Sequence, residues 1–190
     1  TRELALIAAH RGFAPSPLLG YAIDYSKFVP RGHYAGDETL RRYFQAMTWY
    51  GLLTFHLNGP DGALRTREAL LLVRALTVRA DLHALWASIF DPITTWVGRS
   101  DDLTVRDYAA VMARVYAASA PVGVLADDAL LARFRALANA LPNPQINGEL
   151  QMPSTAAYPA EKGLRLFGQR FVADAAIMQS LIYDKVGTAQ

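Results

Sequence analysis

The feature that most constrains the fold is a helical hydrophobic period that recurs between Asp37 and Leu141. Apolar residues repeat at i, i+3, i+4 and i+7, and a capping residue or a turn separates each stretch from the next. The clearest stretch follows Asp37 and runs to about Thr54, with its apolar side at Leu40, Tyr43, Phe44, Met47, Tyr50 and Phe55. This pattern predicts a mainly α-helical protein.

About seven helices are expected in all, and their short connections favour antiparallel hairpins. Thr104 and Asp107 have the spacing of a capping box, with Asp in place of the usual Glu. An α/α toroid-like arrangement in two layers is left open by the pattern. Besides the stretch after Asp37, the helices are expected at 3–10, from Thr66 to about Val78, from Asp81 to Phe90 with a further turn from Pro92 to Val97, from Thr104 to about Ser119, from Asp127 to Leu141, and over about 174–183.

Long loops interrupt this helical pattern at 12–36, 98–103 and 142–172. The stretch 20–36 is rich in aromatic residues, which indicates a loop that packs down onto the protein. Pro and Gly dominate 142–163, and two short strands are expected at 145–150 and 164–168. No Gly-rich or Pro-rich linker divides the chain, so residues 1–190 are expected to form a single helical domain.

Composition excludes several classes of protein. The chain has 190 residues, 52% of them hydrophobic, a net charge of only +2 and no Cys. Intrinsic disorder, zinc–cysteine sites, iron–sulfur clusters and disulfide frameworks are therefore excluded. No basic run is longer than Arg41-Arg42, so nucleic-acid binding is not expected. No apolar stretch reaches the roughly 18 residues of a membrane span.

The usual catalytic motifs are missing from the sequence. It contains no phosphate-binding G-x-x-x-x-G-K, no dinucleotide-binding G-x-G-x-x-G, no G-x-S-x-G and no H-E-x-x-H. The four His residues lie too far apart to share one helix face, so neither a metal nor a cofactor is expected.

Acidic residues offer two further possibilities. Asp101 and Asp102 could bind a calcium ion or serve as acid and base, but the sequence favours a role in stabilising the N-terminus of the helix that begins at Thr104. A pair of carboxylates for glycoside hydrolysis could come from Asp91, Asp101, Asp102 or Glu149. Only the distance between them decides whether such a pair exists.

Two stretches combine Arg with other polar residues among large apolar ones. Arg31 and His33 flank a Gly, and an Arg fork with a titratable His suits a carboxylate, sulfate or phosphate. The structural alternative is that Arg31 bonds backbone carbonyls at a helix end and His33 packs against Tyr34. Gln169 and Arg170 lie in the second stretch, with Arg165 nearby. Buried Arg needs partners, so an internal ion-pair network with Asp101, Asp102 or Asp174 is favoured over a binding site there. The candidate ligand-binding residues are Arg31, His33, Asp101, Asp102, Gln169 and Arg170.

The sequence resembles the bacterial and archaeal DUF3160 family of unknown function. The resemblance rests on stretches spread along the chain in order: Tyr25 to Tyr34, Leu40 to Gly51, Val97 to Thr104 with Asp107 and Tyr108, and Arg165 to Phe171 with Asp174. It implies no catalytic residue, because the family has no assigned activity. Members of the family are longer, and many look exported or lipid-anchored. The resemblance therefore implies a fragment of a larger domain in an extracytoplasmic setting.

Three functions are compatible with the sequence. The first is an extracytoplasmic helical domain that binds a ligand or a partner. The second is a hydrolase of glycan or another envelope polymer, with Tyr25, Tyr34, Trp49 and Trp96 available to stack on sugars. The third is a structural segment that docks through an apolar face on the rest of its own chain or on another protein.

Overall fold

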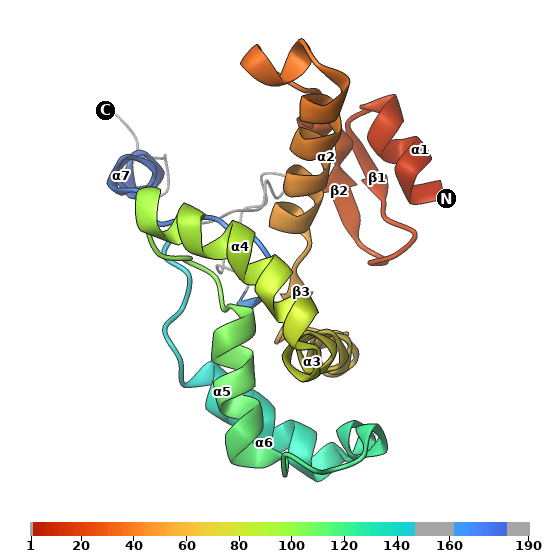
Figure 1. Ribbon diagram of the computed structural model, residues 1–190, viewed down its shortest axis with the longest axis vertical. Coiled ribbons are helices and arrows are strands. Elements are labelled where there is room, and N and C mark those ends of the chain that lie inside the picture. The colour runs from red at the N-terminus through yellow and green to blue at the C-terminus, as the bar shows by residue number, and fades with distance from the viewer. Residues whose placement is uncertain (1, 147–161, 182–190) are drawn as a thin grey trace, which may run out of the picture. The chain divides into compact units, whose positions relative to one another are not determined.

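The computed structural model describes residues 2–146 and 162–181. The chain divides into two compact units, Thr1–Leu53 and Thr54–Gln190, and each is described by itself. The described residues form seven α-helices and only two short antiparallel strand pairs (Figure 1). The expected mainly α-helical class is therefore confirmed.

The first unit is held together by a buried carboxylate. Glu3 accepts hydrogen bonds from the Tyr25 hydroxyl at 2.6 Å and from Ser16 Oγ at 2.9 Å, and all three residues are buried. Tyr25 and Phe28 are also closed to solvent, so this part of the aromatic loop packs down as expected. In chain order the elements are α1 (Arg2–Ala9), β1 (Phe13–Pro15), β2 (Ala22–Asp24), the 3-10 helices η1 (Tyr25–Phe28) and η2 (Gly32–Ala35), and α2 (Glu38–Leu52).

Helix α2 begins where the sequence predicts, because Asp37 accepts a hydrogen bond from the backbone N–H of Leu40 at 3.0 Å. No residue of α2 is buried, however. Leu40, Tyr43 and Tyr50 are all more than one third exposed, although they belong to the apolar stripe of the helix. The apolar face of α2 is therefore partly exposed to solvent.

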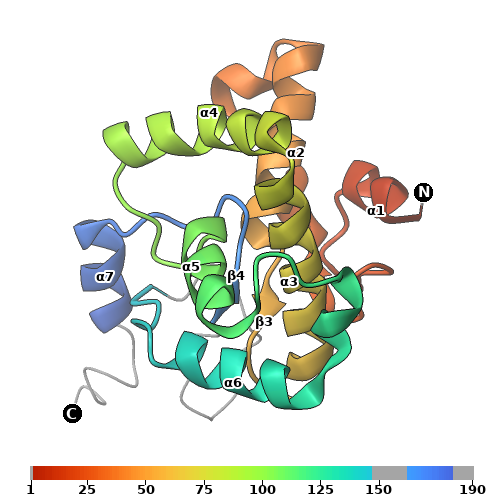
Figure 2. The same cartoon turned by 60° about the horizontal axis from the view of Figure 1, so that its bottom comes forward.

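The second unit carries the larger core. Leu70, Val73, Tyr108 and Phe134 are fully buried, and the Tyr108 and Phe134 rings pack 5.1 Å apart. Helices α5 and α6 lie side by side in both views (Figures 1 and 2). The elements are β3 (Phe55–His56), α3 (Gly62–Val78), α4 (Ala80–Trp96), α5 (Val105–Val115), the 3-10 helix η3 (Val122–Ala126), α6 (Asp128–Asn139), β4 (Gly163–Leu164) and α7 (Ala173–Ser180).

Helices α3 and α4 are joined by a single residue, Arg79. Its backbone is extended, with φ of −100° and ψ of 98°, so the helical path breaks there. Figure 1 shows α3 end-on while α4 lies across the view, and Figure 2 shows both helices in length. The two helices therefore meet at a steep angle, and α4 extends away from α3.

Two predicted helix starts are wrong. Helix α3 begins at Gly62, four residues before Thr66, and the Thr66 hydroxyl donates to the Gly62 carbonyl at 2.6 Å inside the helix. Helix α4 begins at Ala80, and Asp81 lies in its first turn with its carboxylate bound to Arg79. Both side chains have a better partner than the backbone N–H groups that a cap would bind.

Several predicted ends also differ. Helix α4 continues through Pro92 to Trp96 without a break, and α5 ends at Val115 because Tyr116 is extended. Helix α6 ends at Asn139. Of the strand expected at 145–150, Gln145 and Ile146 form a bend and residues 147–150 lie outside the described residues. Of the strand expected at 164–168, only Leu164 is part of β4.

The last helix, α7, covers most of the expected range, and residues 182 and 183 lie outside the described part of the chain. No helix among the described residues combines the length and the apolar character that crossing a bilayer requires.

Candidate ligand-binding pocket

The site is organised by residues 162–171, which run between two other parts of the second unit. On one side β4 pairs with β3, with Leu164 opposite Phe55. On the other side the backbone N–H of Arg165 donates to the Leu103 carbonyl at 3.2 Å, and Ser100 pairs with Arg170. Residues 99–104 are thereby fixed as an ordered wall between α4 and α5.

A polar pocket of about 340 Å³ opens along this wall. Phe90 and Thr94 line it from the C-terminal half of α4, and Arg106 and Asp107 line it from the first turn of α5. The remaining lining comes from residues 99–104, residues 141–143 and Gln145. The pocket thus combines charged, hydroxyl and amide groups with the apolar side chains of Phe90, Leu103, Leu141 and Pro142, and such a mixture is typical of sites for small molecules.

Asp101 holds the opposite wall in place. One oxygen of its carboxylate, Oδ2, accepts the backbone N–H groups of Gln145 at 2.8 Å and Ile146 at 2.7 Å. Its own N–H donates to the Gln169 carbonyl at 2.8 Å. Asp101 therefore connects residues 141–146 to residues 162–171, and it has a structural task in addition to lining the pocket.

Lys162 supports the same wall by binding carbonyl groups at the C-terminal end of α6. It is buried, and its ammonium group donates to the carbonyls of Asn139, at 2.9 Å, and Leu141. Cations at a helix C-terminus satisfy carbonyls that the helix leaves open. Burial lowers the pKa of the Lys162 ammonium group.

Asp102 forms a buried ion pair with Arg165. The Arg165 Nη1 and Asp102 Oδ2 atoms lie 3.5 Å apart, and the two side chains are only 4% and 5% exposed. Asp102 also accepts the backbone N–H of Gln169 at 3.0 Å, and Arg165 Nε donates to Thr54 Oγ1 at 2.6 Å. This pair is the internal ion-pair network that the sequence left as the alternative to a binding role.

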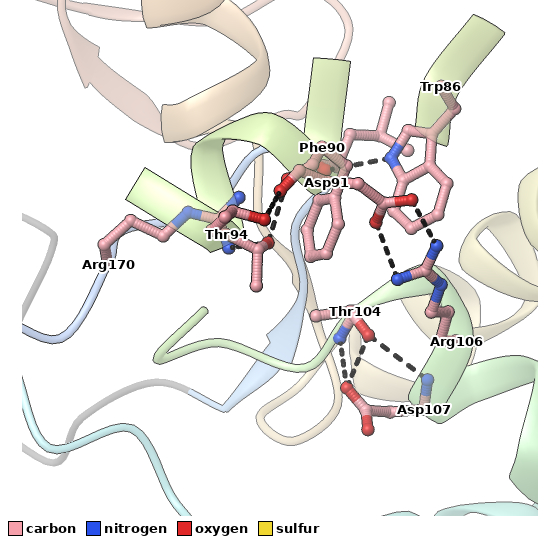
Figure 3. A network of polar contacts seen from close by, with 10 residues as sticks. Trp86, Phe90, Asp91, Thr94, Thr104, Arg106, Asp107 and Arg170 are labelled. Atoms are coloured by element: carbon pink, nitrogen blue, oxygen red, sulfur yellow. Dashed lines mark hydrogen bonds and ion pairs between the residues drawn. The ribbon is translucent and has the colours of Figure 1, made fainter. Parts of the chain in front are cut away.

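A stack of rings and guanidinium groups lies beside the pocket at α4, and Phe90 and Arg106 of this stack line the pocket (Figure 3). The Trp86 and Phe90 rings stack with centroids 4.5 Å apart, and the Trp86 indole N–H donates to the Leu166 carbonyl at 3.1 Å. The Arg106 guanidinium carbon lies 5.3 Å from the Trp86 ring centroid, and that of Arg170 lies 4.5 Å from the Phe90 centroid. Both distances are within the range of cation–π attraction.

Arg106 is also paired with a carboxylate. Its two terminal nitrogens bind the two oxygens of Asp91 at 2.8 and 2.9 Å, a bidentate geometry. The Arg106 guanidinium lowers the pKa of the Asp91 carboxyl group and itself has a raised pKa. Asp91 is therefore ionised at neutral pH and suited to positioning Arg106.

The capping box at the start of α5 is present as predicted. Asp107 Oδ2 accepts the Thr104 backbone N–H at 2.8 Å and the Thr104 hydroxyl at 2.6 Å. The Asp107 N–H in turn donates to Thr104 Oγ1 at 3.2 Å. Asp107 is therefore the acid of the capping box at this helix start.

The structure brings four of the six predicted site residues together. Asp101 and Asp102 line the pocket, Gln169 bonds to both of them through its backbone, and Arg170 lies buried behind Thr94 and Phe90. Arg31 and His33 belong to the first unit, where both are exposed and the His33 ring packs 4.0 Å from that of Tyr34.

Other predicted groups have different surroundings. Tyr25 is 1% exposed and bonded to Glu3, so it cannot stack on a sugar, whereas Trp96 is 86% exposed. Glu149 lies outside the described residues. Within the described part of the chain, no group of three or more His, Asp or Glu residues is placed to hold a metal ion.

Sequence reasoning missed Arg99, Thr94 and the aromatic pair Trp86 and Phe90. Both aromatic residues lie in the helix predicted from Asp81 to Phe90, but nothing in its pattern indicated a pocket beside them. Arg99 lines the pocket, is exposed, and forms no side-chain hydrogen bond or ion pair with the described residues. The sequence predicted that Arg99 lies in a loop at 98–103, but it did not indicate which residues surround Arg99.

The second unit is mainly α-helical and has a pocket lined by residues 99–104 and 141–143 and by Gln145. A family model described as "Protein of unknown function (DUF3160)" matches residues 1–190, and the chain belongs to this family. The resemblance found in the sequence is therefore confirmed. No curated protein and no solved structure matches this chain.

Proposed function

We propose that the second unit is a ligand-binding domain whose site is the pocket between α4, α5 and residues 141–145. The observation that carries this proposal is the polar lining of the pocket, above all Arg99, whose guanidinium is exposed and has no partner among the described residues. An Arg without a carboxylate neighbour is suited to a ligand that carries a carboxylate, phosphate or sulfate group.

Hydrolysis is less well supported, because each carboxylate near the pocket is committed to another group. Asp91 binds Arg106, Asp102 binds Arg165, and Asp107 belongs to the capping box. Asp101 accepts two backbone N–H groups through one oxygen. A general acid or base needs a carboxylate oxygen that can face the substrate, and these contacts already engage each of the four carboxylates. Binding therefore explains the site with fewer assumptions than acid–base chemistry.

The first unit favours docking as a second candidate function. Leu40, Tyr43 and Tyr50 leave the apolar stripe of α2 exposed. We propose the remainder of a longer chain as the occupant of this face, since family members are expected to be longer than this chain. Tyr43→Glu in the full-length protein should then increase protease sensitivity, whereas Gln45→Glu, a change on the same helix away from the stripe, should not.

An extracytoplasmic location is part of the same proposal. Its support is the family resemblance, and the absence of Cys is compatible with it. Alkaline phosphatase fused to the C-terminus of the full-length protein should be active in cells. An inactive but stably expressed fusion would contradict this location.

The binding proposal is tested by amide NMR spectra recorded with glucose, acetate and inorganic phosphate as probes. At least one probe should shift the amides of residues 99–107 and those of Leu141, Asn143 and Gln145. Asn143→Trp should abolish the shifts by filling the pocket, whereas Asn143→Ala should preserve them, since Asn143 is an exposed lining residue. If none of the probes moves these amides, or if Asn143→Trp changes nothing, the binding proposal is wrong.

A further inference from the structure

Two neighbouring side chains at the pocket wall each have a buried polar atom without a partner. Ser100 Oγ and Arg170 Nη2 are closed to solvent and have no hydrogen-bond partner among the described residues. Arg170 as a whole is only 8% exposed. Buried polar groups in folded proteins nearly always have a partner, so each exception calls for an explanation.

The backbone places these two side chains next to each other. Ser100 and Arg170 are opposite each other in an isolated antiparallel bridge. The flanking bonds run from the Asp101 N–H to the Gln169 carbonyl, at 2.8 Å, and from the Phe171 N–H to the Arg99 carbonyl, at 3.3 Å. This pattern makes Ser100 and Arg170 a non-hydrogen-bonded pair, in which the side chains project to the same side and approach most closely.

Another nitrogen of the Arg170 guanidinium already has a partner. Its Nη1 donates to Thr94 Oγ1 at 3.2 Å, and its carbon lies 4.5 Å from the Phe90 ring centroid (Figure 3). The Thr94 hydroxyl is itself fixed, because it donates to the Phe90 carbonyl at 2.8 Å. One nitrogen of this charged group therefore remains without a partner and can donate to an oxygen acceptor.

The charge of Arg170 is only partly compensated. Burial lowers the pKa of its guanidinium, and the nearby Asp102 carboxylate opposes that effect. Asp102, however, faces Arg165 directly. The Asp102 carboxylate therefore compensates two buried cations, Arg165 and Arg170. An additional anion beside Arg170 would reduce the free-energy cost of burying its charge.

We propose that Ser100 and Arg170 form an anion subsite at the wall of the pocket, which binds one oxygen of a carboxylate, phosphate or sulfate group on the ligand. This inference rests on the proposed binding function and specifies the chemistry of the ligand. The ligand oxygen accepts hydrogen bonds from Arg170 Nη2 and Ser100 Oγ, while Arg99 at the rim of the pocket contributes a second positive charge.

A ligand would reach the subsite through the pocket. Ser100, Thr94 and Phe90 all line the pocket, and Thr94 and Phe90 are the residues that contact the Arg170 guanidinium. Because both unpartnered atoms are closed to solvent, an oxygen reaches them only after a local shift of these side chains. Association should accordingly be slower than the usual range for a preformed site.

The subsite is tested by titrating the protein with inorganic phosphate, acetate and glucose and following binding by NMR and calorimetry. Ser100→Ala removes one donor but no bond seen in the structure, so the variant should unfold at the same urea concentration as the parent or higher. It should weaken phosphate binding about tenfold. Ser88→Ala is the matched control, since Ser88 is exposed on α4 and its hydroxyl donates to the Leu85 carbonyl.

Arg170→Lys is a second variant, which keeps the charge but loses the planar fork, and it should weaken phosphate binding at least as much as Ser100→Ala. If Arg170→Lys does not fold, Ser100→Ala still decides the matter. Binding of glucose without phosphate or acetate would overturn the anion subsite and leave the proposed binding function standing. Binding of none of the three probes would overturn both. Equal phosphate affinity in the parent and in Ser100→Ala would also overturn the subsite.

Discussion

Replacing Asp102 by Asn should destabilise the second unit strongly, because the change leaves the buried Arg165 without the carboxylate that faces it. The charged atoms are 3.5 Å apart, and both side chains are about 95% buried. Coulomb's law with an effective dielectric constant of about 20 gives an attraction of about 5 kcal/mol at that distance. Breaking one partner of such a pair usually costs about 3–5 kcal/mol. We therefore expect a loss of about 3–5 kcal/mol in the free energy of unfolding.

The assay is urea unfolding followed by Trp fluorescence in a Trp49→Phe background. Trp86 and Trp96 then report on the second unit alone. The midpoint should fall while the slope stays constant. Asp128→Asn is the matched control, because Asp128 pairs with Arg67 but its side chain is 94% exposed, and it should change the free energy by less than about 1 kcal/mol.

A double variant separates the ion pair from other roles of Asp102. Combining Asp102→Asn with Arg165→Met removes both charges, so the combined loss should be clearly smaller than the sum of the single losses. A loss below about 1 kcal/mol for Asp102→Asn would refute the reasoning. Additive losses in the double variant would refute it as well.

Three further predictions concern packing, capping and titration. Gly163→Ala should cost about 1–3 kcal/mol or more, because a Cβ would lie 2.4 Å from the Phe55 carbonyl oxygen, whereas Gly123→Ala has open space; equal midpoints for the two variants in urea would contradict this. Thr104→Ala should cost about 1 kcal/mol by loss of the α5 cap, measured in the same assay, and Thr104→Ser should restore most of it. Burial raises the pKa of Tyr25 and of Tyr108, so both should stay protonated when exposed tyrosines ionise in an ultraviolet titration. The pKa of each hydroxyl is higher in the folded than in the unfolded protein, where it is about 10. The two tyrosines therefore contribute fully to stability below a pH of about 10, and this contribution is lost as the pH rises further. A free energy of unfolding that rises above that pH would contradict this expectation.

Local signals in the sequence predicted much of the secondary structure. Asp37, Thr104 and Asp127 were expected to cap helices, and each accepts a hydrogen bond from a backbone N–H in the first turn. Thr66 and Asp81 have the same chemistry but failed as caps. Thr66 bonds to Gly62 because the chain turns into helix directly after Asp61, and Asp81 bonds to the adjacent Arg79. Identical residue types thus behave differently according to partners that spacing alone does not reveal.

The pocket was harder to predict because it depends on contacts between distant residues. Asp101 and Asp102 could be singled out as acids in a loop, but their partners Gln145, Ile146 and Arg165 lie more than 40 positions further along the chain. The Ser100–Arg170 pair spans a similar separation. These contacts form because residues 162–171 pair with other segments as a short strand. Strand β4 has only two residues, which is too short to show a hydrophobic period in the sequence.

A crystal structure of the protein with selenate would show directly whether Arg170 and Ser100 at the pocket wall bind an anionic oxygen, because the anomalous signal of selenium locates the anion. A selenate peak is expected within hydrogen-bond distance of Arg170 Nη2 and Ser100 Oγ, and it should weaken in Ser100→Ala. A water molecule in that place with no anomalous peak, or a direct hydrogen bond between the two side chains, would contradict it.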